Sequence, residues 1–247
     1  MSEHISVTQM AMFLRCPRQY RFRYLEGFKV PPRASMVRGS SFHKANETNL
    51  VQKIETKRDL PIDEVKEVFS SEFDARVQEV ELQPDENAGE IKDAGLQLVE
   101  AYHTQLSPKV QPVAVERAFE IEIQGQPMTG VIDLETENCI HETKTTSKSA
   151  SVANIDHQLQ LCAYAHATDK ETFQLDYAVD ANTKKPARVE SFTLLKRDLP
   201  LARFASYVEE FLDALQKGSF PPCAPGNWSC SDRWCGYWNI CKCGGQS

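Results

Sequence analysis

Hydrophobic residues recur every three or four positions through the first hundred residues, and this spacing predicts a helical region. Ser6-Val-Thr-Gln9 has the pattern of a capping box, so a helix should begin there and end near Gly27. Pro31-Pro32 then interrupts the pattern. Three further helices are expected, beginning near Ser40, at Pro61 and at Asn87, the last reaching Gln105.

The period shortens to two after residue 110, which is typical of strands. Strands are expected over residues 113–123, 128–134 and 139–145, joined by turns at 124–127 and 137–138. Such short connections predict an antiparallel meander. A helix over 152–168, strands over 173–179 and 189–195, and a helix over 200–217 should follow.

This order of elements predicts an α/β fold with a mixed central sheet flanked by helices. We expect residues 1–247 to form one domain, with a helical region at 1–110, a core at 111–218 and a cysteine-rich coil at 219–247. With 41% hydrophobic and 26% charged residues, the composition is that of a globular protein. The sequence has neither a membrane-spanning apolar run nor a signal peptide, so we expect a cytoplasmic protein without a membrane partner.

The charge distribution gives opposing indications about nucleic acid. A formal net charge of −7 is unfavourable for binding phosphates. Locally the balance reverses, because four arginines fall within nine residues, at positions 15, 18, 21 and 23, and Arg33 and Arg38 follow. Such a cluster is either the solvated face of a helix or a surface that binds DNA.

Two acids and one lysine stand on neighbouring predicted strands. Asp133 lies near the end of one strand, and Glu142-Thr-Lys144 lies on the next. Because side chains alternate across a strand, Glu142 and Lys144 should share a face. An isolated Glu-x-Lys is most often a solvated ion pair. If Asp133 lies beside Glu142, however, the group suits a hard divalent cation, which prefers oxygen ligands.

The surrounding motifs resemble the RecB-like branch of the PD-(D/E)XK nucleases. Gly-x-Ile-Asp133 and Glu142-x-Lys144 are followed by a helix with Gln160-x-x-x-Tyr164. A histidine after a glycine, His43, and an acid on the first strand, Glu116, complete the likeness. The resemblance implies a restriction-endonuclease-like core and hydrolysis of DNA phosphodiester bonds.

Roles for individual residues also follow from this resemblance. It implies that His43, Asp133 and Glu142 bind Mg²⁺ or Mn²⁺, with the Thr143 carbonyl and Glu116 as further ligands. Lys144 would orient or activate the attacking water and stabilise charge at phosphorus. Gln160 and Tyr164 would position the DNA backbone or support the metal site, with Gln158 as a competitor for Gln160. The arginines expected to bind DNA are Arg15, Arg18, Arg21 and Arg38.

The eight cysteines are unevenly placed. Cys139 and Cys162 lie in apolar stretches and should be core residues. Cys230, Cys235 and Cys241 fall within twelve residues without a Cys-x-x-Cys pair, which disfavours zinc. An iron-sulfur cluster can combine three such cysteines with a distant fourth, and Cys16-Pro is the candidate.

This arrangement resembles the iron-sulfur nucleases of the same branch, which include AddB-type helicase-nucleases, CRISPR spacer-acquisition nucleases and phage exonucleases. The resemblance implies a 4Fe-4S cluster that ties the cysteine-rich coil to Cys16, although the gap of four residues after Cys230 departs from the usual two. Zinc bound by residues 230, 235, 241 and 243 is the alternative. Cys223 or Cys243 could replace a named ligand.

Together these features favour a metal-dependent DNA exonuclease that acts on single strands or duplex ends. One alternative is a spacer-processing nuclease of CRISPR adaptation. Another is a DNA-binding module that has lost catalysis, although the intact Asp133, Glu142 and Lys144 argue against it. A helicase, recombinase or integrase could deliver the DNA.

Overall fold

The computed structural model describes residues 4–148, 155–224 and 226–241. Its contacts divide the chain into two compact units. The core unit comprises Pro32–Phe119 and Val131–Leu199, and the terminal unit comprises Met1–Pro31, Glu120–Gly130 and Pro200–Ser247. Each unit brings together segments that are distant in sequence, and each contains one of the two candidate sites.

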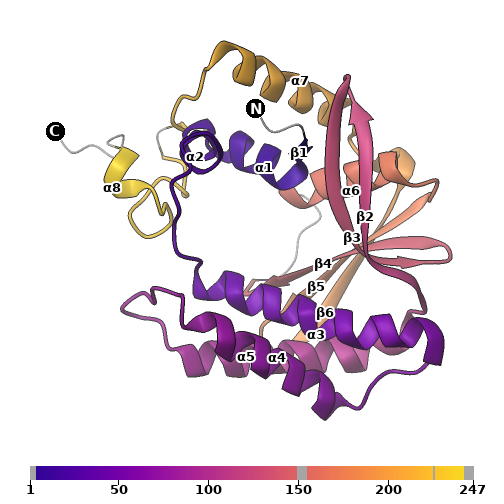
Figure 1. Ribbon diagram of the computed structural model, residues 1–247. Helices are drawn as coiled ribbons and strands as arrows, with labels where there is room; N and C mark the ends of the chain where they lie inside the picture. The colour runs from indigo at the N-terminus through magenta and orange to yellow at the C-terminus, as the bar shows by residue number, and fades with distance from the viewer. Residues whose placement is uncertain (1–3, 149–154, 225, 242–247) are drawn as a thin grey trace. The chain divides into compact units, whose positions relative to one another are not determined.

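Three helices form a layer in the core unit: α3 (Ala34–Thr56), α4 (Ile62–Val77) and α5 (Ala88–Gln105) (Figure 1). Buried aromatic side chains of α3, α4 and α5 hold the layer together, among them Phe42, Phe69, Phe73 and Tyr102. The bounds of α4 and α5 confirm the sequence prediction, and Asn87 caps α5 by accepting two backbone N–H groups.

The expected start of the second helix near Ser40 was wrong, because α3 begins six residues earlier, at Ala34. Arg33, which follows the two prolines, is still extended. Beyond it, Ala34 and Val37 are buried and continue the apolar stripe of the helix. The helix therefore starts directly after Arg33, its extended N-cap.

In the described residues, six strands form one mixed sheet with the order β1-β3-β4-β5-β6, and β2 pairs with β3. The strands are β1 (Ile5–Ser6), β2 (Pro112–Ile123), β3 (Gln126–Thr136), β4 (Cys139–Thr146), β5 (Thr172–Val179) and β6 (Arg188–Leu195). The β3–β4 and β5–β6 pairs are antiparallel, whereas β4–β5 is parallel. The predicted α/β class with a mixed central sheet is confirmed.

Side-chain alternation along β4 places helices on both of its faces. Thr143 hydrogen-bonds Tyr102 of α5, and the Thr145 hydroxyl lies against Gly39 of α3. Lys144 and Glu142, which alternate with these threonines, take the other face, where Glu142 meets α6 (Ile155–Ala167). Residues 152–154, the start of the predicted span of α6, lie outside the described residues.

The terminal unit contains α1 (Val7–Arg15), α2 (Pro17–Tyr20), a π-helical turn (Arg21–Leu25), α7 (Leu201–Lys217) and α8 (Trp238–Cys241). The capping box of Ser6 and Gln9 is confirmed. The expected continuous helix to Gly27 was wrong, because Cys16 is extended at φ −160° and ψ 104°. The residue before a proline avoids the helical region, so Pro17 ends α1 at Cys16.

Short elements escaped the sequence pattern. The two-residue strand β1 pairs in parallel with β3, and 3₁₀ turns occur at Ser107–Lys109 and Lys196–Asp198. Elements of two or three residues carry too little periodicity to be detected. Among the described residues, no helix is long and apolar enough to cross a membrane.

Candidate active site

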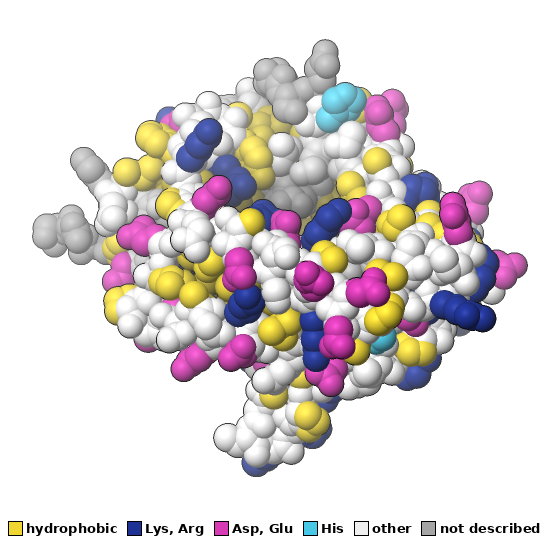
Figure 2. All heavy atoms as spheres, turned by 60° about the horizontal axis from the view of Figure 1, so that its bottom comes forward, with side chains coloured by type: hydrophobic (Ala, Val, Ile, Leu, Met, Phe, Trp, Pro, Cys, Tyr) yellow, Lys and Arg dark blue, Asp and Glu magenta, His cyan; other side chains and the backbone are white. Residues whose placement is uncertain are grey.

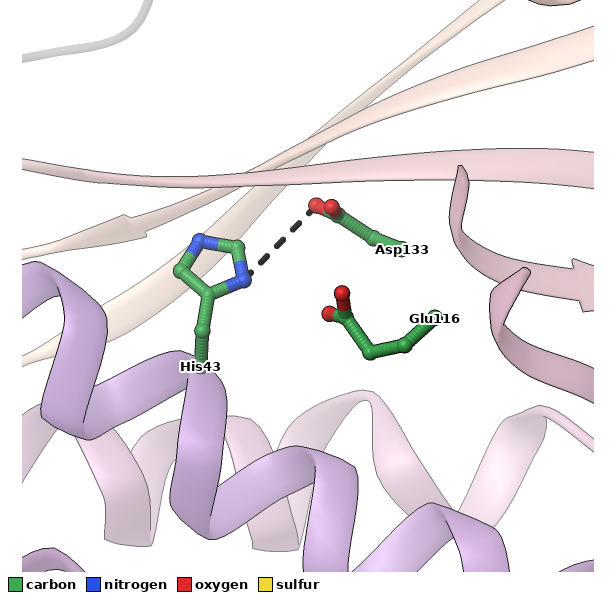
Figure 3. A group of neighbouring side chains, drawn as sticks. All are labelled: His43, Glu116 and Asp133. Carbon is green, nitrogen blue, oxygen red and sulfur yellow. Dashed lines mark ion pairs between the residues drawn. The ribbon is translucent and has the colours of Figure 1, made fainter. Parts of the chain in front are cut away.

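Three side chains of the core unit converge on one point. His43 comes from α3, Glu116 from β2 and Asp133 from β3, and one ligand atom of each lies within 4.8 Å of the others. His43 Nδ1 is 3.8 Å from Asp133 Oδ2, and both carboxylates point toward the imidazole ring (Figure 3). One nitrogen and two carboxylates from separate elements form a ligand set that suits a divalent cation.

Glu116 reaches this point through an unusual backbone conformation. Its φ is 48°, in the left-handed region, although it lies within a strand. Left-handed residues inside strands are typical of bulges, which turn one side chain away from the regular alternation. The sequence gives no sign of this conformation, because nothing in Val-Glu-Arg favours a positive φ.

The electrostatics of the trio favour a cation. Partial burial is the largest of the causes that raise the pKa of Glu116 to about 7; the nearby acids Asp133, Glu47 and Glu142 contribute to this rise, and Lys44 opposes it. Burial and the surrounding carboxylates together outweigh Lys44, so the carboxyl group of Glu116 holds its proton more tightly than usual. The arrangement therefore fits a divalent ion, which would replace that proton.

Glu47 is a site residue that the sequence analysis missed. It follows His43 by one turn of α3, lines the same small pocket and forms an ion pair with Lys44 at 2.9 Å. Its signal was the spacing His-x-x-x-Glu, which places both side chains on one helical face. Asn46 lines the pocket as well.

Glu142 lies beside the trio rather than within it. Its side chain is fully buried, forms an ion pair with Lys144, and accepts a hydrogen bond from the Tyr164 hydroxyl at 2.5 Å. The same hydroxyl is 2.8 Å from the Val131 carbonyl oxygen. Burial raises the pKa of Glu142 and Asp133 adds to this, while Lys144 and Tyr164 oppose it.

Asp133 and Glu142 are neighbours through the strand register. Leu134 pairs with His141, so one further step sets Asp133 opposite Glu142. There the backbone amide of Thr143 donates to Asp133 Oδ2 at 2.9 Å. This bond holds the carboxylate of Asp133, a member of the trio, on the strand beside the one that carries the Glu142–Lys144 pair.

Lys144 has neighbours that the sequence did not indicate. Burial opposes its protonation, but Glu142 and Asp133 outweigh burial, so the pKa of Lys144 is raised. Tyr177 lies opposite it on β5, and the Tyr177 hydroxyl is 2.7 Å from His157 Nδ1 on α6. Burial, followed by Lys144, lowers the pKa of His157 to about 4, so this imidazole is neutral at neutral pH.

The glutamines of the predicted motif lie on α6. Gln160 is half-buried and precedes Tyr164 by four residues on the same helix. Gln158, the competing residue, is also half-buried.

Comparison with known proteins places these residues in a family. A sequence model of the PD-(D/E)XK nuclease superfamily matches residues 4–242, almost the whole chain. The chain belongs to the PD-(D/E)XK nuclease superfamily. Its members are nucleases, so the family indicates a hydrolase that acts on nucleic acid.

Two solved structures resemble this PD-(D/E)XK protein. One, from Eubacterium rectale, is described as "Putative exonuclease"; it has a TM-score of 0.58 and 13% identity, with 94% of this chain and 86% of that chain covered. The crystal structure of SSO0001 has a TM-score of 0.47 and 16% identity, with coverage of 98% and 86%. At such identities the likeness to the E. rectale protein concerns the fold alone. No curated protein matches the sequence significantly.

Three of the four arginines expected to bind DNA, Arg18, Arg21 and Arg38, contact other groups of this family member. Arg38 Nη1 lies 3.0 and 3.1 Å from the two carboxylate oxygens of Asp180. Arg21 pairs with Glu26 at 2.5 Å, Arg18 Nε donates to the Phe220 carbonyl at 3.5 Å, and Arg15 Nε is buried. Figure 2 shows acidic and basic side chains interspersed over the described part of the face that it brings forward.

A second site of this nuclease-family chain is a pocket in the terminal unit. We call it the cysteine pocket, because five of the described cysteines line it: Cys16, Cys223, Cys230, Cys235 and Cys241. Gln19 Nε2 is 3.3 Å from Cys235 Sγ. Burial, then the neighbouring Cys16, raise the pKa of Cys223 to about 12, and its thiol hydrogen-bonds Cys16 and Cys230.

The cysteine pocket contains the distant Cys16 together with the C-terminal cysteines and includes Cys223, which was not among the preferred ligands. Cys243 lies outside the described residues. Clustered thiols suit soft metal centres, iron-sulfur or zinc. Cys162 is buried as expected, but the core assignment of Cys139 was wrong, because this residue is half-exposed at the start of β4, directly after a turn.

Proposed function

We propose that this chain is a divalent-metal-dependent deoxyribonuclease that digests DNA as an exonuclease. The observation that carries the proposal is the convergence of His43, Glu116 and Asp133 within 4.8 Å, next to the register position of Glu142. The name of the E. rectale structure is consistent with exonuclease action. Among the described residues, no other group of three His, Cys, Asp or Glu side chains has this spacing.

His43, Glu116 and Asp133 would bind Mg²⁺ or Mn²⁺, and Glu142 and the Thr143 carbonyl are the proposed further ligands. These ions favour oxygen ligands in octahedral geometry and leave positions for water and phosphate. A bound ion would supply a Lewis acid for the phosphate and a water of lowered pKa. Glu142 would join it by exchanging its ion pair with Lys144 for the cation.

Lys144 would act as a cation rather than as a base. Since its pKa is raised, the amine keeps its proton at neutral pH. The ammonium group can therefore donate hydrogen bonds to the water and to phosphate oxygens, which stabilises negative charge at phosphorus. The Tyr164 hydroxyl, whose pKa is raised by burial and by Glu142, stays neutral and orients the Glu142 carboxylate.

For the cysteine pocket we propose a 4Fe-4S cluster held by Cys16, Cys230, Cys235 and Cys241. The shared pocket and the direct contact of Gln19 with Cys235 support this assignment. The cluster would join α2 to the C-terminal segment and so have a structural role. Zinc is the competing metal, and Cys223 is the competing ligand because its thiol touches Cys16 and Cys230.

The DNA partner would be engaged by Arg15, Arg18, Arg21 and Arg38. Arg38 would have to exchange Asp180 for phosphate, since both carboxylate oxygens of Asp180 contact it. A helicase, recombinase or integrase that delivers DNA ends is compatible with this role. Spacer processing in CRISPR adaptation remains the alternative within the same chemistry.

Degradation of end-labelled DNA with Mn²⁺ tests the proposal. Lys144→Ala should lower the rate by about 10²- to 10⁴-fold. The matched control is Lys170→Ala, whose amine contacts Glu135 and the Glu137 carbonyl and should leave the rate within about twofold. Equal activity of the two variants, or no activity of the wild-type chain with either metal, would contradict the assignment.

Substrates labelled at the 5′ or the 3′ end, single-stranded or duplex, test the exonuclease part separately. Stepwise release of nucleotides from one end supports it. Cleavage of a covalently closed circle at the same rate would show an endonuclease instead. Both outcomes leave the metal site itself unaffected.

A further inference from the structure

Two tryptophans of the terminal unit are exposed to solvent. The exposed fraction is 67% for Trp228 and 48% for Trp234, and their rings meet edge to face with centroids 5.9 Å apart. The Arg233 guanidinium carbon lies 5.5 Å from the centre of the Trp234 ring. Large aromatic side chains usually lie in a core, so two exposed together point to an interaction surface.

The segment that carries these rings is held by the N-terminal segment of the same unit. The Tyr237 hydroxyl donates to the Phe28 carbonyl at 3.4 Å, and Gly236 packs so closely on Val30 that an added Cβ would lie 2.3 Å from it. Gln19 contacts Cys235. Residues 4–31 and 226–241 therefore form one substructure, which we call the tail substructure.

The charge of the tail substructure is opposite to that of the whole chain. It contains six Arg and Lys residues, at positions 15, 18, 21, 23, 29 and 233, against Glu26 and Asp232. Its formal charge is thus +4, whereas the whole chain has −7. A positive local charge combined with exposed aromatic rings fits a polyanion that offers flat apolar faces.

We propose that the tail substructure binds single-stranded DNA by stacking bases on Trp228 and Trp234, with its cations near the phosphates. In a duplex the bases already stack on one another, so their faces are not available to aromatic side chains, whereas a single strand exposes them. Stacking is tolerant of sequence, because every base has a π face. This inference rests on the proposed function and specifies its substrate class as single-stranded.

Intrinsic tryptophan fluorescence of the full chain, purified with its metal content intact and without added Mg²⁺ or Mn²⁺, provides the test. Oligo(dT) should quench the emission, and a blunt-ended duplex of two separate strands should quench it far less. In anisotropy titrations with labelled oligo(dT), Trp228→Ala and Trp234→Ala should each weaken binding by about 5- to 100-fold. Trp228→Phe and Trp234→Phe should retain most of the affinity, because phenylalanine also stacks.

Leu25→Ala is the matched control, because Leu25 is 47% exposed in the same unit but has no ring. Its affinity for oligo(dT) should stay within about twofold of wild type. Should an alanine variant not fold, as judged by circular dichroism, protection of the wild-type tryptophans from acrylamide by oligo(dT) gives the same information. Unchanged affinity in both alanine variants, equal quenching by duplex and single strand, or no protection from acrylamide would each overturn the inference.

The outcome can be separated from that of the nuclease assignment. Quenching by oligo(dT) in a chain that degrades no DNA would support this surface and contradict the proposed catalysis. Degradation without quenching, and without loss in the alanine variants, would contradict this surface alone. Self-association that is lost in the tryptophan variants, with unchanged oligo(dT) binding, would show that a protein covers the rings and would also overturn the inference.

Discussion

The metal trio of the core unit and the cysteine pocket of the terminal unit are built from opposite kinds of donor. His43, Glu116 and Asp133 offer hard oxygen and imidazole ligands in a half-exposed pocket crowded by further acids. The cysteine pocket offers sulfur alone and is lined by ring and apolar side chains, among them Phe22 and Tyr237. Hard ligands with open positions suit an ion that meets substrate, whereas enclosed thiolates suit a centre that holds structure.

The two sites should therefore fail in different ways. Loss of a ligand in the trio should remove chemistry and leave the fold, because the acids around it already repel one another. Loss of a ligand in the cysteine pocket should remove fold, because binding to thiolates is coupled to folding.

The largest effect is expected for Cys235→Ser. Cys235 is buried in the pocket and contacts Gln19, so its loss should abolish visible absorption and destabilise the terminal unit. Binding to thiolate sites contributes about 10 kcal/mol in small zinc domains, which sets the scale. Absorption spectra and thermal melts measure both effects, and Cys139→Ser, outside the pocket, is the control. If the wild-type protein is colourless and contains zinc, the iron-sulfur proposal is wrong and the pocket is a zinc site.

Asp133→Asn should have the complementary effect. We expect DNA cleavage to fall more than about 100-fold, beyond the 10- to 100-fold typical of residues that only support a ligand. Visible absorption and melting temperature should stay as in wild type, because Asp133 makes its contacts with His43 and the Thr143 amide, within the core unit. Loss of colour in this variant would show that the two sites are not independent.

A smaller effect is expected for His141→Gln, which separates stability of the core unit from metal binding. Burial alone would lower the pKa of His141, but Asp176, 2.8 Å away, and Cys139 raise it to about 9. His141 thus binds its proton more tightly in the folded state than in the unfolded state. This proton stabilises the fold by about 3 kcal/mol; the stabilisation is complete below pH 6.5 and is lost as the pH rises through about 9.

Urea unfolding at pH 6 and at pH 9.5 measures this effect. His141→Gln should be less stable than wild type at pH 6, and the difference should shrink at pH 9.5. The same difference at both values would mean that packing, rather than the charge on His141, stabilises this part of β4.

Much of the fold could be read from the sequence because periodicity and turn residues agree. Asn87 marked the start of α5, and Gln124-Gly125, both with positive φ, joined β2 to β3 where the sequence placed a turn. Errors arose where a proline acted locally. Cys16 is extended because Pro17 follows it, and α3 starts directly after Arg33.

The candidate site was only partly predictable. Glu142 and Lys144 share a face because strand alternation is regular, and their ion pair reflects this. By contrast, Glu116 depends on a positive φ, Glu47 on the packing of α3 beside the strands, and His157 on Tyr177 of β5. Such positions are set by tertiary contacts, which no local pattern encodes.

Pulsed electron paramagnetic resonance of Mn²⁺ bound to the full chain tests the central claim most directly. The ion should bind at one site and show coupling to an imidazole nitrogen, because His43 Nδ1 lies 3.8 Å from Asp133 Oδ2. This coupling should disappear in His43→Gln and persist in His103→Gln, whose ring contacts the Leu60 carbonyl instead. Mn²⁺ that binds without nitrogen coupling, or with coupling unchanged in His43→Gln, would contradict the assignment of the trio as the metal site.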